Sequence, residues 1–380
     1  MRVLRLLTLG LCLAIAPLSA RAACELPPGG WMTPGGEPLD ERVLYRELAT
    51  SQAVLLGERH DRMAHHRWQL STLAHVRAHE PHLVLGLEMF PRTVQPVLDA
   101  WVDGELDERE FLRRSGWYEH WGFDPALYLP VLHFARMHGI PLIGLNLERP
   151  VIQRIGAEGW DAVPAAERDD VGPAAGPGTR YRERLMESFE QHAEHGMAGD
   201  AEAFVRAQLA RDRAMAEGIS SAREEHDGAL VVALIGRGHL AYGDGVPYEL
   251  ADLGLDDVAV LLPDGVDGDC GERDPDLADA LFRLDDARHE RAAPSLGVTL
   301  GEADADGVRV TGVMPESVAA GAGLEEGDRI ITAAGERLKA PAELQRIIHR
   351  QAPGTWLPLE VVRDGETGQV IARFPPSPDD

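Results

Sequence analysis

Five short apolar runs limit the fold of this chain more than any other feature. They lie at residues 53–57, 83–89, 141–147, 229–236 and 258–262. Runs of this length, bounded by polar segments, are typical of strands buried on both faces of a parallel sheet. Helical patterns lie between them at residues 62–80, 109–114 and 128–138. The alternation predicts an α/β domain with a mostly parallel sheet and flanking helices.

A long, mostly helical segment interrupts this alternation at residues 150–225. It is broken by a loop rich in glycine and proline at residues 172–178. We expect this segment to form a helical cap over one end of the sheet. We therefore assign residues 23–293 to the first domain, whose last part, residues 264–291, reads as a polar acidic separator.

A different pattern follows residue 293. One helix is predicted at residues 342–350, together with strands at residues 296–300, 308–313, 329–333, 357–363 and 370–374. This composition predicts a small β-rich domain over residues 294–375. Residues 376–380 are expected to form a disordered tail.

The net charge narrows the classes of partner. The chain has 63 acidic and 37 basic side chains, which give a formal charge of −26. Duplex nucleic acid and anionic lipid headgroups need a broad basic surface, so neither is expected as a partner.

The first residues resemble a secretory signal. Arg2 and Arg5 precede an apolar stretch at residues 6–17, and Ala20 and Ala22 fit a small-x-small cleavage site. A signal peptide over residues 1–22 predicts a periplasmic or secreted protein. Lipid anchoring at Cys24 is the less favoured alternative, because Arg21 stands where lipid-attachment sites usually carry an apolar residue. Whether Cys24 and Cys270 form a disulfide is left open.

Side chains suited to metal binding or acid–base chemistry follow several of the predicted strands. Glu58 and His60 follow the first run, Glu88 ends the second, Asn146 ends the third and His239 follows the fourth. Because carboxyl ends of parallel strands meet at one edge, we expect these side chains to converge. Two carboxylates and two imidazoles suit manganese, iron or zinc, and they equally suit general acid–base work without a metal.

Each of these residues also has a purely structural interpretation. A buried carboxylate is costly unless it is paired, which favours a functional role for Glu88. Glu58 could cap a turn, His239 could be a satisfied half-buried histidine, and Asn146 is expected to support the backbone. The pairs His65–His66 and His75–His79 are interpreted as solvated helix faces.

These motifs together resemble the ChaN-like haem-binding uptake family of the Tiki superfamily. The resemblance covers about residues 53–262 and rests on Gly57-Glu58-Arg59-His60-Asp61, His65-His66, Gln69, Glu88-Met89-Phe90, Arg92, Gln95, Trp121, Tyr128, Asn146, Arg149, the segment 208–215, Gly236-Arg237-Gly238-His239 and Gly243-Asp244-Gly245-Val246-Pro247.

That resemblance implies an α/β fold with a helical cap, secretion or lipid anchoring in bacteria, and a link to haem or iron uptake. The superfamily also contains metal-dependent proteases and hydrolases, and by similarity their metal site maps to Glu58, His60, Glu88 and His239. No motif marks a haem ligand, so the haem-binding residues stay unknown. Tyr128, Tyr181, Tyr242 and Tyr248, with Met63, Met186, Met197 and Met215, could serve haem, but each alone reads as packing.

Residues 294–375 resemble a PDZ domain of the kind attached to periplasmic proteases. The segment Ser295-Leu296-Gly297-Val298 resembles its carboxylate-binding loop, and residues 315–324 and 326–331 match the following turn, helix and strand. The resemblance implies that Leu296, Gly297 and Val298 bind the C-terminus of a peptide or protein. The alternative is a spacer that only mediates contacts between subunits.

Two functions are therefore expected. The first is a secreted haem- or iron-binding protein linked to uptake, whose PDZ domain docks a peptide C-terminus. The alternative is a metal-dependent hydrolase or peptidase, with manganese or zinc as cofactor, in which the strand-end residues Glu58, His60, Glu88 and His239 are catalytic. Whether haem sits within one subunit or between two is open, so a homodimer stays among the expected partners.

Overall fold

The computed structural model describes residues 28–194, 199–264, 273–284, 294–304 and 307–376. The expected signal peptide, Cys24, Cys270 and the boundary near residue 293 lie outside these ranges, as do residues 377–380 of the expected tail. Within the described residues, no helix is long and apolar enough to cross a membrane.

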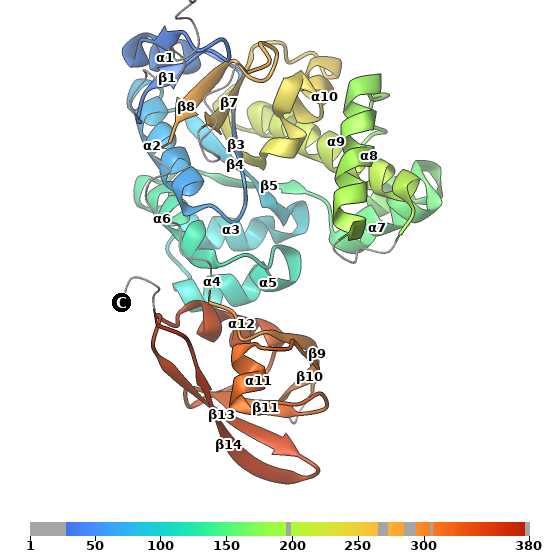
Figure 1. The fold of residues 1–380 in the computed structure, drawn as a ribbon. Coiled ribbons are helices and arrows are strands. Elements are labelled where there is room, and N and C mark those ends of the chain that lie inside the picture. The colour runs from blue at the N-terminus through green and yellow to red at the C-terminus, as the bar shows by residue number, and fades with distance from the viewer. Residues whose placement is uncertain (1–27, 195–198, 265–272, 285–293, 305–306, 377–380) are drawn as a thin grey trace, which may run out of the picture.

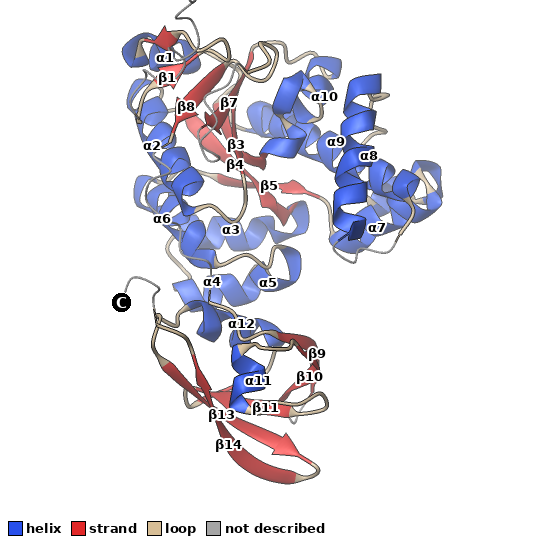
Figure 2. Cartoon of the chain, in the orientation of Figure 1, coloured by secondary structure: helices blue, strands red, loops and turns tan. Residues whose placement is uncertain are grey.

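The first domain is built on one mixed sheet, which confirms the predicted α/β class (Figure 1, Figure 2). In the described residues its strand order is β2-β1-β8-β7-β3-β6-β4-β5. The strands are β1 (Trp31–Met32), β2 (Pro38–Leu39), β3 (Ala53–Glu58), β4 (Leu83–Pro91), β5 (Leu142–Asn146), β6 (Leu230–Gly236), β7 (Val258–Asp264) and β8 (Ala280–Arg283).

The five strands predicted from apolar runs are β3, β4, β5, β6 and β7, and all pair in parallel. The interpretation of residues 264–291 as a separator was wrong in part, because β8 lies there and pairs in parallel with β7. β8 has four residues, and the polar residues around it leave little apolar pattern in the sequence. β1 pairs antiparallel with β8 and was not predicted.

Helices cover both faces of this sheet. They are α1 (Glu41–Leu48), α2 (Met63–His79), α3 (Gln95–Val102), α4 (Glu108–Arg114), α5 (Trp117–His120), α6 (Leu129–His138), α7 (Arg149–Glu158), α8 (Thr179–Glu194), α9 (Ala201–Glu225) and α10 (Val246–Asp252). Alternate strand residues supply two cores: Leu56 packs on the side of α2, α3 and α6, and Leu55 on the side of α9 and α10.

The helical insertion has its own small cores. Ile152 and Ile155 of α7 pack against Ala210 and Ala214 of α9, while Leu185 of α8 packs with Val205. Figure 1 shows α7 and α8 standing beside α9, away from α2 and α6. The predicted helical cap is therefore present, and it is anchored through α9.

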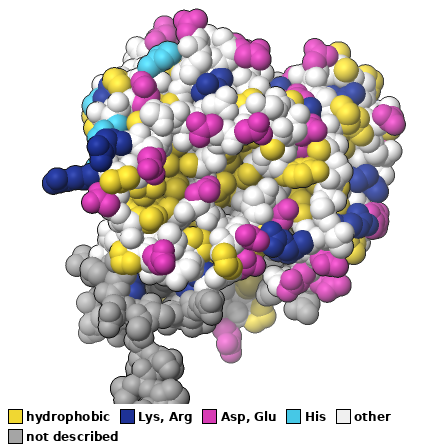
Figure 3. Space-filling view, turned by 90° about the horizontal axis from the view of Figure 1, so that it is seen from above, with side chains coloured by type: hydrophobic (Ala, Val, Ile, Leu, Met, Phe, Trp, Pro, Cys, Tyr) yellow, Lys and Arg dark blue, Asp and Glu magenta, His cyan; other side chains and the backbone are white. Residues whose placement is uncertain are grey.

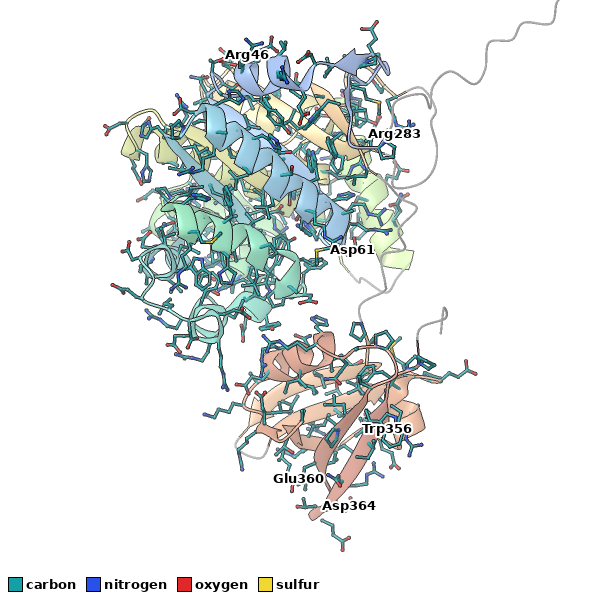
Figure 4. The ribbon with its side chains drawn as sticks, turned by 90° about the vertical axis from the view of Figure 1, so that its left-hand side faces the viewer. Arg46, Asp61, Arg283, Trp356, Glu360 and Asp364 are labelled. Carbon is teal, nitrogen blue, oxygen red and sulfur yellow. The ribbon has the colours of Figure 1, made fainter. Side chains whose placement is uncertain are left out.

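The second domain is the predicted small β-rich unit. It contains β9 (Val298–Asp304), β10 (Gly307–Val313), α11 (Val318–Ala322), β11 (Arg329–Ala333), β12 (Glu336–Arg337), α12 (Pro341–His349), β13 (Trp356–Arg363) and β14 (Glu366–Arg373). Its strands are antiparallel in the order β14-β13-β11-β10-β9. Figure 4 labels Trp356, Glu360 and Asp364 on the hairpin of β13 and β14. An ion pair of 3.1 Å joins Arg350 to Glu108 of the first domain.

Candidate functional site

The site lies where β3, β6 and β4 end side by side. Glu58 is the last residue of β3 and is in register with Gly236, the last residue of β6. A 3₁₀ turn, η6 (Arg237–His239), follows β6 directly, and Glu88 lies near the end of β4. Parallel register therefore brings Glu58, Glu88 and His239 to one edge, as the sequence predicts.

Glu58 is a buried carboxylate with several partners. Its side chain is 1% exposed, and Oε1 accepts hydrogen bonds from Tyr128 Oη and His60 Nδ1, each at 2.7 Å. His66 Nδ1 lies 2.8 Å from Oε2. Burial alone would raise the pKa of Glu58, but the hydrogen bonds and charges of His60 and His66 lower it to about 2. Glu58 is therefore an anion that holds His60 from one side.

His60 faces the site with its other nitrogen. Burial lowers its pKa, but the hydrogen bond to Glu58 and the charge of Glu88 outweigh that effect, so the net pKa is raised. The ring centroid lies 4.6 Å from that of Trp121 and 5.2 Å from that of Phe123. Figure 4 labels the next residue, Asp61, beside the start of α2. Aromatic walls and a carboxylate thus set the ring's orientation.

His239 belongs to a second group made of a tyrosine, a carboxylate and a histidine, like the group of Tyr128, Glu58 and His60. Its Nδ1 lies 2.5 Å from Asp212 Oδ1, and Tyr181 Oη donates to Asp212 Oδ2 at 2.6 Å. Asp212 is fully buried in the middle of α9. Burial lowers the pKa of His239, but the charge and hydrogen bond of Asp212 raise it above its ordinary value. Burial and the charge of Asp212 place the pKa of Tyr181 well above 10.

Glu88 lies between the two units. Its Oε2 accepts the backbone N–H of Gly236 at 2.5 Å, and its Oε1 is 3.7 Å from His239 Nε2. A Cβ at position 236 would stand 3.0 Å from His60 Nε2 and 3.4 Å from Glu88 Oε2. Glycine is therefore required at 236, because any side chain would occupy the space into which both groups project. All four predicted residues converge around this point.

The supporting residues differ in how well they were predicted. Asn146 binds backbone, donating to Glu88 O at 3.2 Å and accepting from Leu147 N at 2.9 Å. The interpretation of His65 and His66 as a solvated helix face was wrong, because both are buried. His65 accepts the Arg59 N–H, and burial lowers its pKa to about 3. Tyr128 and Tyr181 each donate to a site carboxylate rather than only packing.

Asp212 was missed, although the sequence carries a signal for it. Val205, Asp212 and Ile219 are spaced by seven residues and are all buried, so a charged residue stands on the apolar stripe of α9. The flanking Arg211 and Arg213 make it read as a surface ion pair.

A pocket of about 300 Å³ opens beside His239. Its lining is Tyr181, Arg184, Leu185, Glu187, Ser188, Gln191, Gln208, Gly238 and His239. Nη2 of Arg184 is paired with Asp244 at 2.7 Å, while its buried Nη1 has no hydrogen bond within the described residues. The pocket thus combines an imidazole, a guanidinium and an apolar wall.

These residues do not form a metal cage as they stand. In the described ranges, no group of three or more His, Cys, Asp or Glu side chains is placed so that it could hold a metal ion. Oε1 of Glu58 already accepts from His60 and Tyr128. The site instead contains two histidines, His60 and His239, each with its Nδ1 beside a carboxylate of its own. A third carboxylate, that of Glu88, lies between them.

The predicted peptide-binding loop precedes the edge strand of the second sheet. β9 pairs only with β10 in the described residues, and α12 packs beside it. Leu296 is buried, and its carbonyl accepts from Ala319 N at 2.8 Å. Gly297 has φ +76°, and a Cβ there would lie 2.3 Å from Ser317 Cβ. Val298 begins β9. An unpaired edge beside a helix suits addition of a peptide strand.

The face of the molecule shown in Figure 3 agrees with the acidic composition. Figure 3 shows Asp and Glu side chains spread over the face seen from above, with fewer Lys and Arg among them. No broad basic surface is visible on this face.

Comparison with known proteins identifies both domains. A family model described as haem-binding uptake, Tiki superfamily, ChaN, matches residues 44–250, which is more than half of the chain. A PDZ domain model matches residues 294–372. A curated relative, RETICULATA-RELATED 5 of Arabidopsis thaliana, is 26% identical over 243 residues, or 57% of this chain. The aligned part is only 32% of that relative's length.

One solved structure agrees with the fold of the first domain. Campylobacter jejuni ChaN, whose structure shows cofacial heme binding, has 19% identity and a TM-score of 0.55, and the match covers 66% of this chain and 95% of that one. A PDZ domain of HtrA3 bound to a phage-derived ligand matches 21% of this chain and 82% of its own with 24% identity. Its TM-score is 0.19, so the family model alone assigns the second domain.

Proposed function

Because this chain belongs to the ChaN-like haem-binding uptake family of the Tiki superfamily, we propose that its first domain binds haem. The observation that carries the proposal is the family match over residues 44–250, which includes both strand-end histidines. The pocket beside His239 is the haem-docking surface that fits this function best. Iron uptake would be the process that this binding serves.

The pocket residues fit a haem group. Tyr181 and Leu185 give an apolar wall for the macrocycle, and Nη1 of Arg184, which has no hydrogen bond among the described residues, is a donor of the kind that a propionate oxygen accepts. Haem iron takes an imidazole nitrogen as an axial ligand. Among the hydrogen bonds of the described residues none involves His239 Nε2, and Glu88 Oε1 lies 3.7 Å from it. His239 is therefore the proposed iron ligand.

The experiment is a haem titration followed by absorbance. The wild-type protein should give a saturable Soret band, and His239→Ala should weaken binding at least about tenfold, as loss of an axial ligand or its support does. The matched control is His79→Ala, at an exposed position on α2, which should bind haem like the wild type. A wild-type protein with no Soret band rejects the proposal, and equal binding by His239→Ala rejects this ligand.

For the second domain we propose capture of a peptide or protein C-terminus. The PDZ match and the unpaired edge of β9 support it. A decapeptide that ends in an apolar residue should bind with its free carboxylate and fail when amidated. Gly297→Val should abolish binding, because a β-branched residue does not tolerate φ +76°. Lys339→Ala is the control. Equal binding of the amidated peptide would show that no terminal carboxylate is read.

Secretion is a separate proposal that rests on residues 1–22 of the sequence. Fractionation of expressing bacteria and the mass of the mature chain test it: cleavage after Ala22 supports export, and an acylated Cys24 would indicate the lipid-anchored alternative. A homodimer that shares haem is tested by measuring molar mass with and without haem.

A second candidate function is hydrolysis, and one observation favours it. Two Tyr–carboxylate–His units face Glu88, a pattern able to move protons at a substrate. The residues as placed do not fit a manganese or zinc cage, so we derive no metal step. Peptide cleavage that is lost in Glu88→Gln would support this candidate.

A further inference from the structure

Asp212 is a buried carboxylate to which the proposed haem site assigns no role. It is 0% exposed, although the other buried residues of its helix are apolar. A buried carboxylate costs several kcal/mol unless it is paired and hydrogen-bonded. Both of its oxygens are used, one by His239 Nδ1 at 2.5 Å and one by the Tyr181 hydroxyl at 2.6 Å. The three residues come from η6, α9 and α8.

The hydrogen-bond chemistry assigns the protons. An ionised carboxylate only accepts, so His239 Nδ1 carries a hydrogen and the Tyr181 hydroxyl donates. In the neutral ring the lone pair then lies on Nε2, which points away from Asp212 and toward Glu88. Charges around the ring come from Asp212 and Arg211 on α9 and from Glu88 on β4.

We propose that Asp212, itself held by Tyr181, is a positioning residue that keeps His239 in the Nδ1–H tautomer with Nε2 presented to a ligand in the adjoining pocket. Carboxylates that accept from the remote nitrogen of a ligating histidine orient the ring and raise its basicity. The contacts of Asp212 and Tyr181 alone support the assignment of the His239 tautomer. The identity of the ligand as haem rests on the proposed function.

The Glu58 unit shows that this arrangement is used twice. There, too, a tyrosine hydroxyl and a histidine Nδ1 share one carboxylate, at 2.7 Å each. The two carboxylates come from unrelated elements, the end of β3 and the middle of α9. A carboxylate that only filled space would not need a tyrosine and a histidine in the same pattern at both positions.

The test has one readout that needs no haem. Protein labelled with ¹⁵N-histidine is titrated by NMR to a pH above which the His239 signals no longer move, so that the ring is neutral, and loss of signals in His239→Gln assigns the resonance. The wild type should show a protonated Nδ1 and a bare Nε2. In Asp212→Asn the isosteric amide can donate to Nδ1, so the other tautomer should become the main form. Asp252→Asn, at an exposed carboxylate on α10, is the control and should leave the tautomer unchanged.

The second readout is haem binding by the same proteins. Asp212→Asn should raise the haem Kd about 10–100-fold, in line with loss of a partner behind a ligating histidine, while its thermal unfolding stays cooperative. An unchanged tautomer in Asp212→Asn overturns the positioning role whatever haem does. A changed tautomer with unchanged haem affinity overturns its link to the ligand. A wild type that binds no haem rejects the proposed function, while the NMR result still decides the role of Asp212.

Discussion

Replacement of Glu58 by glutamine tests how much the ionised Glu58 carboxylate, with its partners His60, His66 and Tyr128, stabilises the folded protein. The pKa of Glu58 falls from its ordinary 4.5 to about 2. Since one pKa unit corresponds to about 1.4 kcal/mol, its ionised form is favoured by roughly 3 kcal/mol on folding. Glu58→Gln keeps the size of the side chain and removes the charge. We expect the free energy of unfolding to fall by about 3 kcal/mol near pH 6.

The dependence on pH separates this charge effect from a general packing defect. A carboxyl whose folded pKa is depressed stabilises the protein above its unfolded pKa, and this stabilisation is lost as the pH falls from about 4.5 toward 2. The difference in unfolding free energy between wild type and Glu58→Gln should therefore be smaller by roughly 2 kcal/mol at about pH 3 than near pH 6.

The assay is urea unfolding of the two proteins in a Trp356→Phe background. Six of the seven tryptophans then remain, all of them before residue 294, so fluorescence reports the first domain. Glu47→Gln, at an exposed position on α1, is the control and should change stability little. A gap below about 1 kcal/mol near pH 6 would refute the reasoning, and so would a gap that stays constant down to pH 3.

Three further predictions concern single contacts. Tyr128→Phe removes the hydroxyl that donates to Glu58 and should lower unfolding free energy by about 1.5–3 kcal/mol; urea unfolding that matches the wild type would contradict this. Gly236→Ala places a Cβ 2.7 Å from His60 Cε1 and should cost about 1–3 kcal/mol, with a shifted His60 NMR signal; an unmoved signal would count against the crowding. Asp328→Asn weakens the two hydrogen bonds from Arg363 to a buried carboxylate and should cost about 2–4 kcal/mol, seen as faster amide exchange in β13; unchanged exchange would show that the pair adds nothing.

The sheet and the convergence of the strand-end residues were predictable for one reason. Parallel strands buried on both faces need continuous apolar sequence, and their carboxyl ends meet at one edge whatever the loops do. Glu58, Glu88 and His239 therefore converge without any knowledge of the helices. β8 was not predicted because a strand of four residues that is surrounded by polar residues leaves little apolar pattern in the sequence.

The partners that complete each unit were not predictable from local sequence. Tyr128 lies 70 residues from Glu58, and Tyr181 lies 31 residues from Asp212. Such pairs form only when the helices have docked on the sheet. His66 follows the same rule, since its burial depends on how α2 packs above β3. Asp212 is the exception, because a charge on the apolar stripe of α9 is visible in the sequence.

The most direct test of the account is a haem titration of the purified protein, run beside iron and transition-metal analysis of the same sample. The account predicts saturable haem uptake with a Soret band, which is lost when His239 and Glu88 are both replaced by alanine. Saturable uptake that survives this double replacement would place haem away from the strand ends. A protein that takes up no haem would contradict the central claim.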